Sequence, residues 1–169
     1  MNKVNDFYER LEFSQKAGHE DFWQAIYKKA FPSMEFAKLC SDKCQGQFLG
    51  IDRVIYLKSG KTLFIDEKKR EKDYPDILLE YISNNTTNSQ GWIEKDLLID
   101  YLAYAFMPSK RCYVLPWELL RRTWIKHKTR FIEKFPKIEA QNEKYKTISV
   151  AIPIETLLNC IKAAMVIQL

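Results

Sequence analysis

The sequence has few of the residues on which several classes of protein depend. Its 169 residues include only 5 glycines and 6 prolines, while 46% of residues are hydrophobic and 29% are charged. This composition excludes collagen-like, low-complexity and disordered chains. The chain also lacks an uncharged apolar run of about 18 residues, the minimum for crossing a membrane. It is therefore expected to form one packed domain over residues 1–169, with no membrane partner.

Cysteine and histidine are scarce too, with four of the first and two of the second. Charged residues stand at the N-terminus where a signal peptide needs an apolar core, so we expect an intracellular, cytoplasmic protein with free thiols. Cys40 and Cys44 have a loose metal-ligand spacing, but only His19 and His127 could complete a zinc site. Neither histidine lies in a setting typical of nucleophilic catalysis. No P-loop or dinucleotide-binding glycine motif is present.

The hydrophobic pattern predicts a mixed α/β (α+β) fold with helices flanking a mixed central sheet. A further helical turn or two is indicated over residues 4–13. Pro32 and Pro108 mark the ends of two helices, and Pro116 and Pro153 mark the starts of two others. The expected helices cover 20–31, 94–106, 117–135 and 153–165, and the expected strands cover 47–57, 62–65, 77–82, 111–115 and 147–152.

Acidic and basic residues interrupt the first two expected strands. Asp52 follows Gly50 in the first strand, and the sequence Asp66-Glu67-Lys68 ends the second. A three-residue loop over 58–60, with Gly60 in the left-handed conformation, would place Asp52 opposite Asp66 on the face that also carries Lys68. A two-residue loop would instead group Asp52 with Glu67 and Lys69. We favour the first register because glycine suits the left-handed position.

Two carboxylates and a lysine on one face fit a particular chemistry. Mg²⁺ binds one or two carboxylates together with water and substrate phosphate, and a neighbouring lysine can orient water or neutralise charge. A solvent-exposed cluster of ion pairs at a strand end is the alternative interpretation. Glu80 interrupts the otherwise apolar third strand, and it is a further candidate ligand because a buried acid without a partner is costly.

The order of elements and these motifs together resemble the PD-(D/E)xK nuclease superfamily, which has the restriction-endonuclease-like αβββαβ fold. The resemblance covers about residues 20–115, with an extra helix, strand and helix after it. It implies Mg²⁺-dependent (or Mn²⁺-dependent) hydrolysis of DNA phosphodiesters, with Asp52 and Asp66 as metal ligands and Lys68 beside the attacking water. The proline that names the motif is absent, since Ile51 precedes Asp52.

The resemblance also implies an acid on the first helix. Glu20 is the preferred candidate, in competition with Glu9, Glu12 and Asp21, and Glu67 is the ligand in the alternative register. The compact single domain suggests that a phage or mobile element encodes the protein.

Basic residues offer a surface for the expected DNA partner, whether duplex, branched or single-stranded. The net charge of +5 permits such a partner without requiring one. Arg122, Lys126, Arg130 and Lys134 recur at intervals of four and should form a ridge along one helix face. Lys69 and Arg70, beside the acids, could contact the same phosphate backbone.

Two further expectations concern association and activity. The uncharged stretch 163–169 is explained equally by buried packing and by a homodimer surface. A non-catalytic DNA-binding or assembly protein that keeps the fold with a degraded site is the alternative function.

Overall fold

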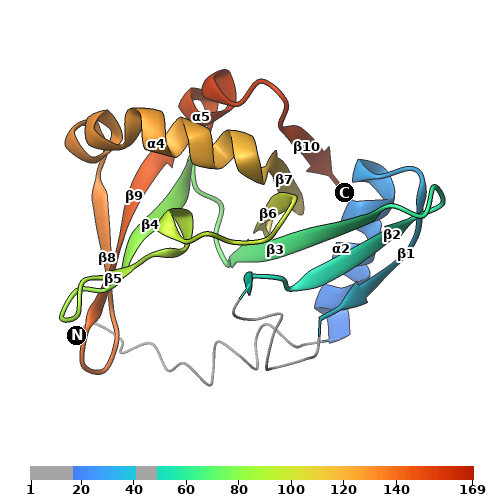
Figure 1. Ribbon diagram of the computed structural model, residues 1–169, viewed down its shortest axis with the longest axis horizontal. Coiled ribbons are helices and arrows are strands. Elements are labelled where there is room, and N and C mark those ends of the chain that lie inside the picture. The colour runs from blue at the N-terminus through green and yellow to red at the C-terminus, as the bar shows by residue number, and fades with distance from the viewer. Residues whose placement is uncertain (1–16, 41–48) are drawn as a thin grey trace.

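The computed structural model describes residues 17–40 and 49–169, which form two sheets with helices packed around them (Figure 1). The main sheet has the strand order β1-β2-β3-β6-β7-β10, and the second sheet has the order β5-β4-β9-β8. The strands of the main sheet are β1 (Met34–Leu39), β2 (Arg53–Leu57), β3 (Thr62–Arg70), β6 (Tyr101–Phe106), β7 (Arg111–Pro116) and β10 (Met165–Gln168). Those of the second sheet are β4 (Asp76–Asn84), β5 (Ser89–Gln90), β8 (Lys137–Gln141) and β9 (Lys146–Pro153).

Helix α2 (Ala17–Ala30) covers one face of the main sheet, behind it in Figure 1. Phe22, Trp23, Ile26 and Tyr27 recur with helical spacing and are all buried. They form a core with residues from the facing strands, among them the small side chains of Ala103 and Ala105. The expected helix over 20–31 is confirmed, and the chain leaves it just before Pro32.

The other face of the main sheet packs against the second sheet and two helices, α4 (Trp117–Lys134) and α5 (Ile154–Cys160). Leu102 and Tyr104 of β6, Leu79 of β4, and Leu120 and Trp124 of α4 belong to one continuous core. A short 3₁₀ helix, η1 (Trp92–Glu94), also packs here through the fully buried Ile93. One hydrophobic core therefore joins the two sheets.

Several expected elements are confirmed, one is wrong, and two are shorter than expected. The strand expected over 47–57 begins only at Arg53 among the described residues, and the last expected helix ends at Cys160. The hairpin of β2 and β3, the strands over 77–82, 111–115 and 147–152, and the helix over 117–135 are all present. The helix expected over 94–106 is not, because its second half is strand β6, parallel to β3. Five consecutive residues of β6 (102–106) are buried, and a strand buried on both faces shows no polar alternation that would distinguish it from a helix.

The second sheet also changes the expected topology. Strand β4 does not belong to the main sheet and pairs with β9 in the second sheet. The connection from β3 to β6 therefore contains β4, β5 and η1 in place of a helix. The last expected helix ends at Cys160, and β10 follows at the edge of the main sheet. Strands β1, β5 and β8 are additional to those expected. The fold is thus mixed α+β, with a mixed sheet flanked by helices.

Some expectations concern other parts of the chain or association. The turn or two expected over 4–13, together with Glu9, Glu12 and Cys44, lies outside the described residues. Within the described part of the chain, no helix is long and apolar enough to span a membrane. Val166 of the edge strand β10 is 50% exposed, and the homodimer remains a prediction.

Candidate active site

The hairpin has the three-residue loop that the sequence favours. The Leu57 N–H donates to the Lys61 carbonyl at 2.9 Å, and Gly60 has a φ of +81°. Along the hairpin Arg53 pairs with Ile65, which places Asp52 opposite Asp66. The Asp52 N–H extends the ladder by donating to the Ile65 carbonyl at 2.9 Å. The first register is therefore confirmed.

Asp52, Asp66 and Lys68 line one cavity of about 410 Å³ on the face of the main sheet opposite α2. The segment after β5 forms its other wall. The full lining is Gly50, Asp52, Asp66, Lys68, Trp92, Lys95 and Leu97. We call this cavity the acid pocket.

The carboxylates of the acid pocket have different surroundings. Asp66 is only 2% exposed, and its Oδ1 accepts a hydrogen bond from Lys68 Nζ at 2.5 Å. Its other oxygen, Oδ2, is buried and has no hydrogen-bond partner among the described residues. The half-buried Asp52 accepts a 2.8 Å hydrogen bond from the backbone N–H of Glu67 at Oδ2. The pocket thus holds the Asp52 carboxylate, which a backbone N–H fixes in place, and the Asp66 carboxylate, whose buried Oδ2 accepts no hydrogen bond.

Burial and neighbouring charges change the protonation of this pair. Burial raises the pKa of Asp66 to about 7, and Lys68 opposes the rise. The Asp52 carboxylate adds to it through its charge and by hydrogen bonding to the protonated form of Asp66, so Oδ2 lacks a partner only in the ionised form. Burial alone would lower the pKa of Lys68, but the charges of Asp66, Asp52 and Glu80 outweigh this effect and raise it. Lys68 therefore remains an ammonium at neutral pH, whereas Asp66 can take up or release a proton there.

The wall after β5 is held close to strand β4. A Cβ on Gly91 would lie 2.2 Å from the Glu80 carbonyl oxygen, so only glycine permits this approach. The next residue, Trp92, lies with its ring centroid 5.9 Å from Lys68 Nζ. No motif in the sequence points to Lys95 as a pocket residue, because the 94–106 segment has a helical pattern. Trp92 precedes that segment and belongs to no motif either. The carboxylate of Glu80 acts on Lys68 electrostatically from β4 and does not line the pocket.

Glu20 and Glu67, which the sequence offered as metal ligands, do not line the acid pocket. They lie on the α2 side of the main sheet, where both bind the buried Arg53. Arg53 Nη1 and Nη2 donate to the two Glu20 oxygens at 2.7 and 3.0 Å, and Nε donates to Glu67 Oε1 at 2.5 Å. The Tyr27 hydroxyl also donates to Glu67 Oε1, at 2.8 Å. These two carboxylates therefore neutralise a buried cation on the other side of the sheet from the acid pocket.

The pKa values in this cluster follow from its geometry. The hydrogen bonds from Arg53 lower the pKa of Glu20, while burial raises the pKa of Glu67 despite the same guanidinium. Burial alone would lower the pKa of Arg53, but its two carboxylate partners raise it. Arg53 is 1% exposed and stays charged, so the cluster is a permanent ionic link between α2 and the hairpin.

The basic residues beside the acids serve different purposes. Arg70 Nη1 donates to the Tyr104 hydroxyl at 3.1 Å and lies 4.0 Å from Asp76, and its guanidinium stacks 4.1 Å from the Tyr74 ring centroid. Arg70 thus joins β3 to the start of β4. The backbone alternation of β3 places Lys69 on the Glu67 side of the sheet, where burial lowers its pKa. Within the described residues, neither side chain lines the acid pocket.

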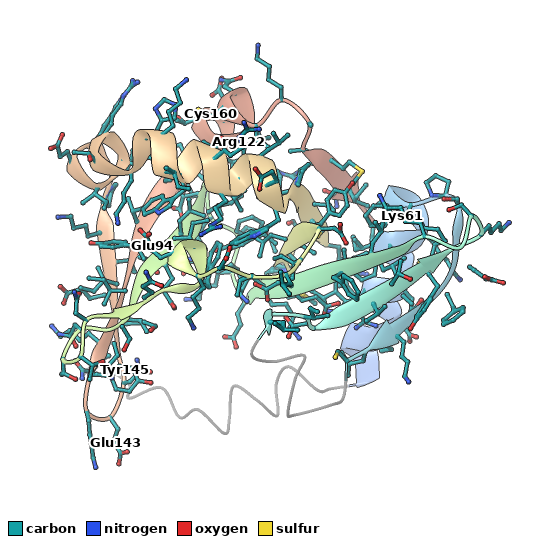
Figure 2. The ribbon with its side chains drawn as sticks, viewed as in Figure 1. Lys61, Glu94, Arg122, Glu143, Tyr145 and Cys160 are labelled. Atoms are coloured by element: carbon teal, nitrogen blue, oxygen red, sulfur yellow. The ribbon has the colours of Figure 1, made fainter. Side chains whose placement is uncertain are left out.

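The four residues of the expected basic ridge are all exposed on α4, as predicted: Arg122, Lys126, Arg130 and Lys134. They do not border the acid pocket as the described residues form it. The flank of α4 nearer that pocket carries bases already paired with acids, Arg121 with Asp96 at 2.7 Å and Lys128 with Glu94 at 2.6 Å. Figure 2 shows Arg122 and Glu94 on opposite sides of α4.

The acid pocket offers two carboxylates to the expected divalent ion. In residues 17–40 and 49–169, no group of three His, Cys, Asp or Glu side chains is placed to hold a metal. Mg²⁺ commonly uses only one or two carboxylates and completes its coordination with water and phosphate. Asp52 and Asp66, with the unused buried Oδ2, fit that pattern. Comparisons with family models, curated proteins and solved structures find no match to this chain.

Proposed function

We propose that the protein is a metal-dependent nuclease that hydrolyses DNA phosphodiester bonds in the acid pocket. The proposal rests mainly on one observation. Asp52, Asp66 and Lys68 line a single cavity, and Asp66 Oδ2 is buried there without a hydrogen-bond partner in the described chain. An unsatisfied buried carboxylate oxygen is costly, and a divalent cation would remove that cost.

Each residue of the acid pocket has a role in this proposal. Asp52 and Asp66 would hold Mg²⁺ or Mn²⁺, which polarises a phosphodiester and lowers the pKa of bound water. Lys68 stays protonated because of its acidic neighbours, so it can stabilise negative charge on phosphate oxygens. Lys95 on the opposite wall supplies a second positive charge for the DNA backbone.

Plasmid cleavage tests this proposal. The purified protein should nick or cut plasmid DNA in Mg²⁺ or Mn²⁺ and not in EDTA. Lys68→Ala and Asp66→Asn should each lower the cleavage rate by about 100-fold or more, as expected for removal of a group that acts at the reacting atoms. Lys61→Ala is the matched control, because it removes an exposed lysine from the sequence just before the same strand. Equal rates for Lys61→Ala and Lys68→Ala would contradict the proposal.

The alternative function has its own support. The Lys68 ammonium already pairs with Asp66, and two carboxylates are fewer than many hydrolytic sites contain. A DNA-binding or assembly protein with a degraded site would retain DNA and cleave nothing with any divalent ion. The same assay, combined with a gel-shift measurement in EDTA, distinguishes this protein from a nuclease.

A further inference from the structure

A second cavity lies between α4 and α5, on the far flank of α4 from the paired bases. Its volume is about 270 Å³. The lining residues are His127, Arg130, Phe131, Lys134, Phe135, Thr156, Asn159 and Cys160. None of them lines the acid pocket, and no acid is among them. We call this cavity the basic pocket.

The polar side chains of the basic pocket are available to a ligand. Across the described residues, Arg130, Lys134, Thr156 and Asn159 make no side-chain hydrogen bond or ion pair; the one contact is Lys134 Nζ, 5.6 Å from the Phe135 ring centroid. On the opposite flank of the same helix, Arg121 and Lys128 are both neutralised. On the hollowed side, Arg130 and Lys134 therefore have no ion-pair partner among the described residues.

The spacing of the two cations favours an anion between them. Arg130 and Lys134 are four residues apart on the helix, so their side chains share one face and repel each other. A phosphate that bridges them would replace this repulsion by charge-assisted hydrogen bonds, and arginine can make two such bonds to one phosphate. The Thr156 hydroxyl and the Asn159 amide provide neutral donors from α5.

The floor of the basic pocket is aromatic. Phe131 is 3% exposed, and its ring centroid lies 5.5 Å from that of His127 and 5.8 Å from that of Phe135. An apolar floor below a cationic rim suits a ligand that joins an anionic group to a flat organic body. A nucleotide has both parts.

We propose that the basic pocket binds a nucleotide through its phosphate, with Arg130 and Lys134 as the main contacts. The nucleotide is either free or part of a nucleic-acid strand, since both present the same phosphate and base. This site is independent of the proposed hydrolysis, because the two pockets share no lining residue. Loss of one function would leave the other measurable.

Cys160 provides a direct readout. It is an exposed free thiol in the lining of the basic pocket, whereas Cys112 is buried and serves as an internal reference. The rate of alkylation at Cys160 is followed by peptide mass spectrometry in EDTA, so that no strand is cleaved. The added probes are a nucleoside 5′-monophosphate, the same nucleoside without phosphate, and a single-stranded oligonucleotide.

The monophosphate or the oligonucleotide should slow alkylation of Cys160, and the nucleoside should not. The double variant Arg130→Gln/Lys134→Gln should raise the probe concentration needed for protection by about tenfold or more, as expected for the loss of two charge-assisted contacts. The control variant Lys58→Gln/Lys61→Gln removes the same charge from the β2–β3 hairpin, which Figure 2 shows well away from Cys160. In this variant the probes should protect Cys160 at the same concentrations as in the wild type.

The outcomes assign the source of the ligand or overturn the proposal. Protection by the free monophosphate indicates a nucleotide site, and protection by the oligonucleotide alone indicates a strand contact. Equal protection of Cys160 by the nucleoside and the nucleotide would contradict the proposed phosphate contact. If no probe protects Cys160, the basic pocket binds no nucleotide. If protection weakens equally in both double variants, only the overall charge of the protein matters, and the proposed contacts are wrong.

Discussion

Asp66 is the residue with the most unusual surroundings in the described chain. It is nearly fully buried, it shares a pocket with a second carboxylate, and its pKa is raised to about 7 although Lys68 contacts it. A carboxyl in this state costs folding free energy once it ionises. In the proposed function, a divalent ion would displace the proton that Asp66 holds near neutral pH.

This pKa predicts how stability depends on pH in the absence of metal. Because the pKa of Asp66 is raised in the folded state, the folded protein binds the proton more tightly than the unfolded chain does. The contribution of Asp66 to stability is therefore complete below its unfolded pKa of about 4 and is lost as pH rises to about 7. Asp66→Asn should remove this dependence, so the stability of the wild type relative to Asp66→Asn should fall between pH 4 and pH 8.

Urea unfolding in EDTA at pH 4 to 8 measures this difference. Glu20→Gln is a useful comparison, because Arg53 lowers the pKa of Glu20 and its contribution has the opposite sign. That contribution is present above the unfolded pKa and is lost as pH falls. A stability difference between wild type and Asp66→Asn that stays constant from pH 4 to 8 would contradict the raised pKa.

At this scale, part of the site could be predicted from sequence and part could not. It could be predicted that Asp52, Asp66 and Lys68 share one face of the hairpin. Strand side chains alternate between faces, and Gly60 favours a left-handed turn, which fixes the register. The positions of Glu20 and Glu67 could not be predicted, because both side chains form ion pairs with the buried Arg53. Burial of a charge by distant partners has no local sequence signal.

Among the elements, the contact between η1 and β4 sets one wall of the acid pocket. Gly91 allows the two backbones to touch, and Trp92 follows it into the pocket. In Gly91→Ala the new methyl group would overlap the Glu80 carbonyl, so η1 must move away from β4. We expect a loss of about 2 to 4 kcal/mol in unfolding free energy, typical of an overpacked backbone contact. Denaturant unfolding measures it.

A second glycine gives the matched control. Gly60→Ala places a methyl group in open space, and its cost comes only from the positive φ, about 1 to 2 kcal/mol. The two variants should also differ in the fluorescence of Trp92, which only Gly91→Ala displaces. If Gly91→Ala were the milder of the two, the close backbone approach would not exist.

The elements differ in how much of them the sequence reveals. Helices α2 and α4 have one buried and one polar side, and their 3.6-residue period is visible without a structure. Strand β6 lies between two other strands and has both faces covered, so its run of apolar residues carries no period of two. Strand β1, at the sheet edge, has mostly exposed side chains and thus little hydrophobic pattern of its own.

For the whole molecule, one core that spans both sheets predicts one unfolding transition. Leu79 of β4 is fully buried in the core that also contains Leu102 of β6 and Leu120 of α4. Leu79→Ala should therefore cost about 2 to 5 kcal/mol, the usual range for a large cavity-forming change. The loss should be the same for probes in either sheet, such as amide exchange in β3 and β9. Independent unfolding of the second sheet would show as unequal losses.

The division of the chain into two sheets could not be inferred from its pattern of elements. The strand over 77–82 has the length and apolar content of a central strand of the main sheet. Its partner in the fold, β9, lies about seventy residues later, and pairing over such a separation depends on three-dimensional packing.

Glu67 has a further consequence for communication across the main sheet. Its backbone N–H holds Asp52 on one side of the sheet, while its carboxylate holds Arg53 and Tyr27 on the other. A single amino acid thus couples the orientation of α2 to the position of an acid-pocket carboxylate. A displacement of α2 would therefore act directly on a residue whose backbone positions Asp52 in the proposed cation site.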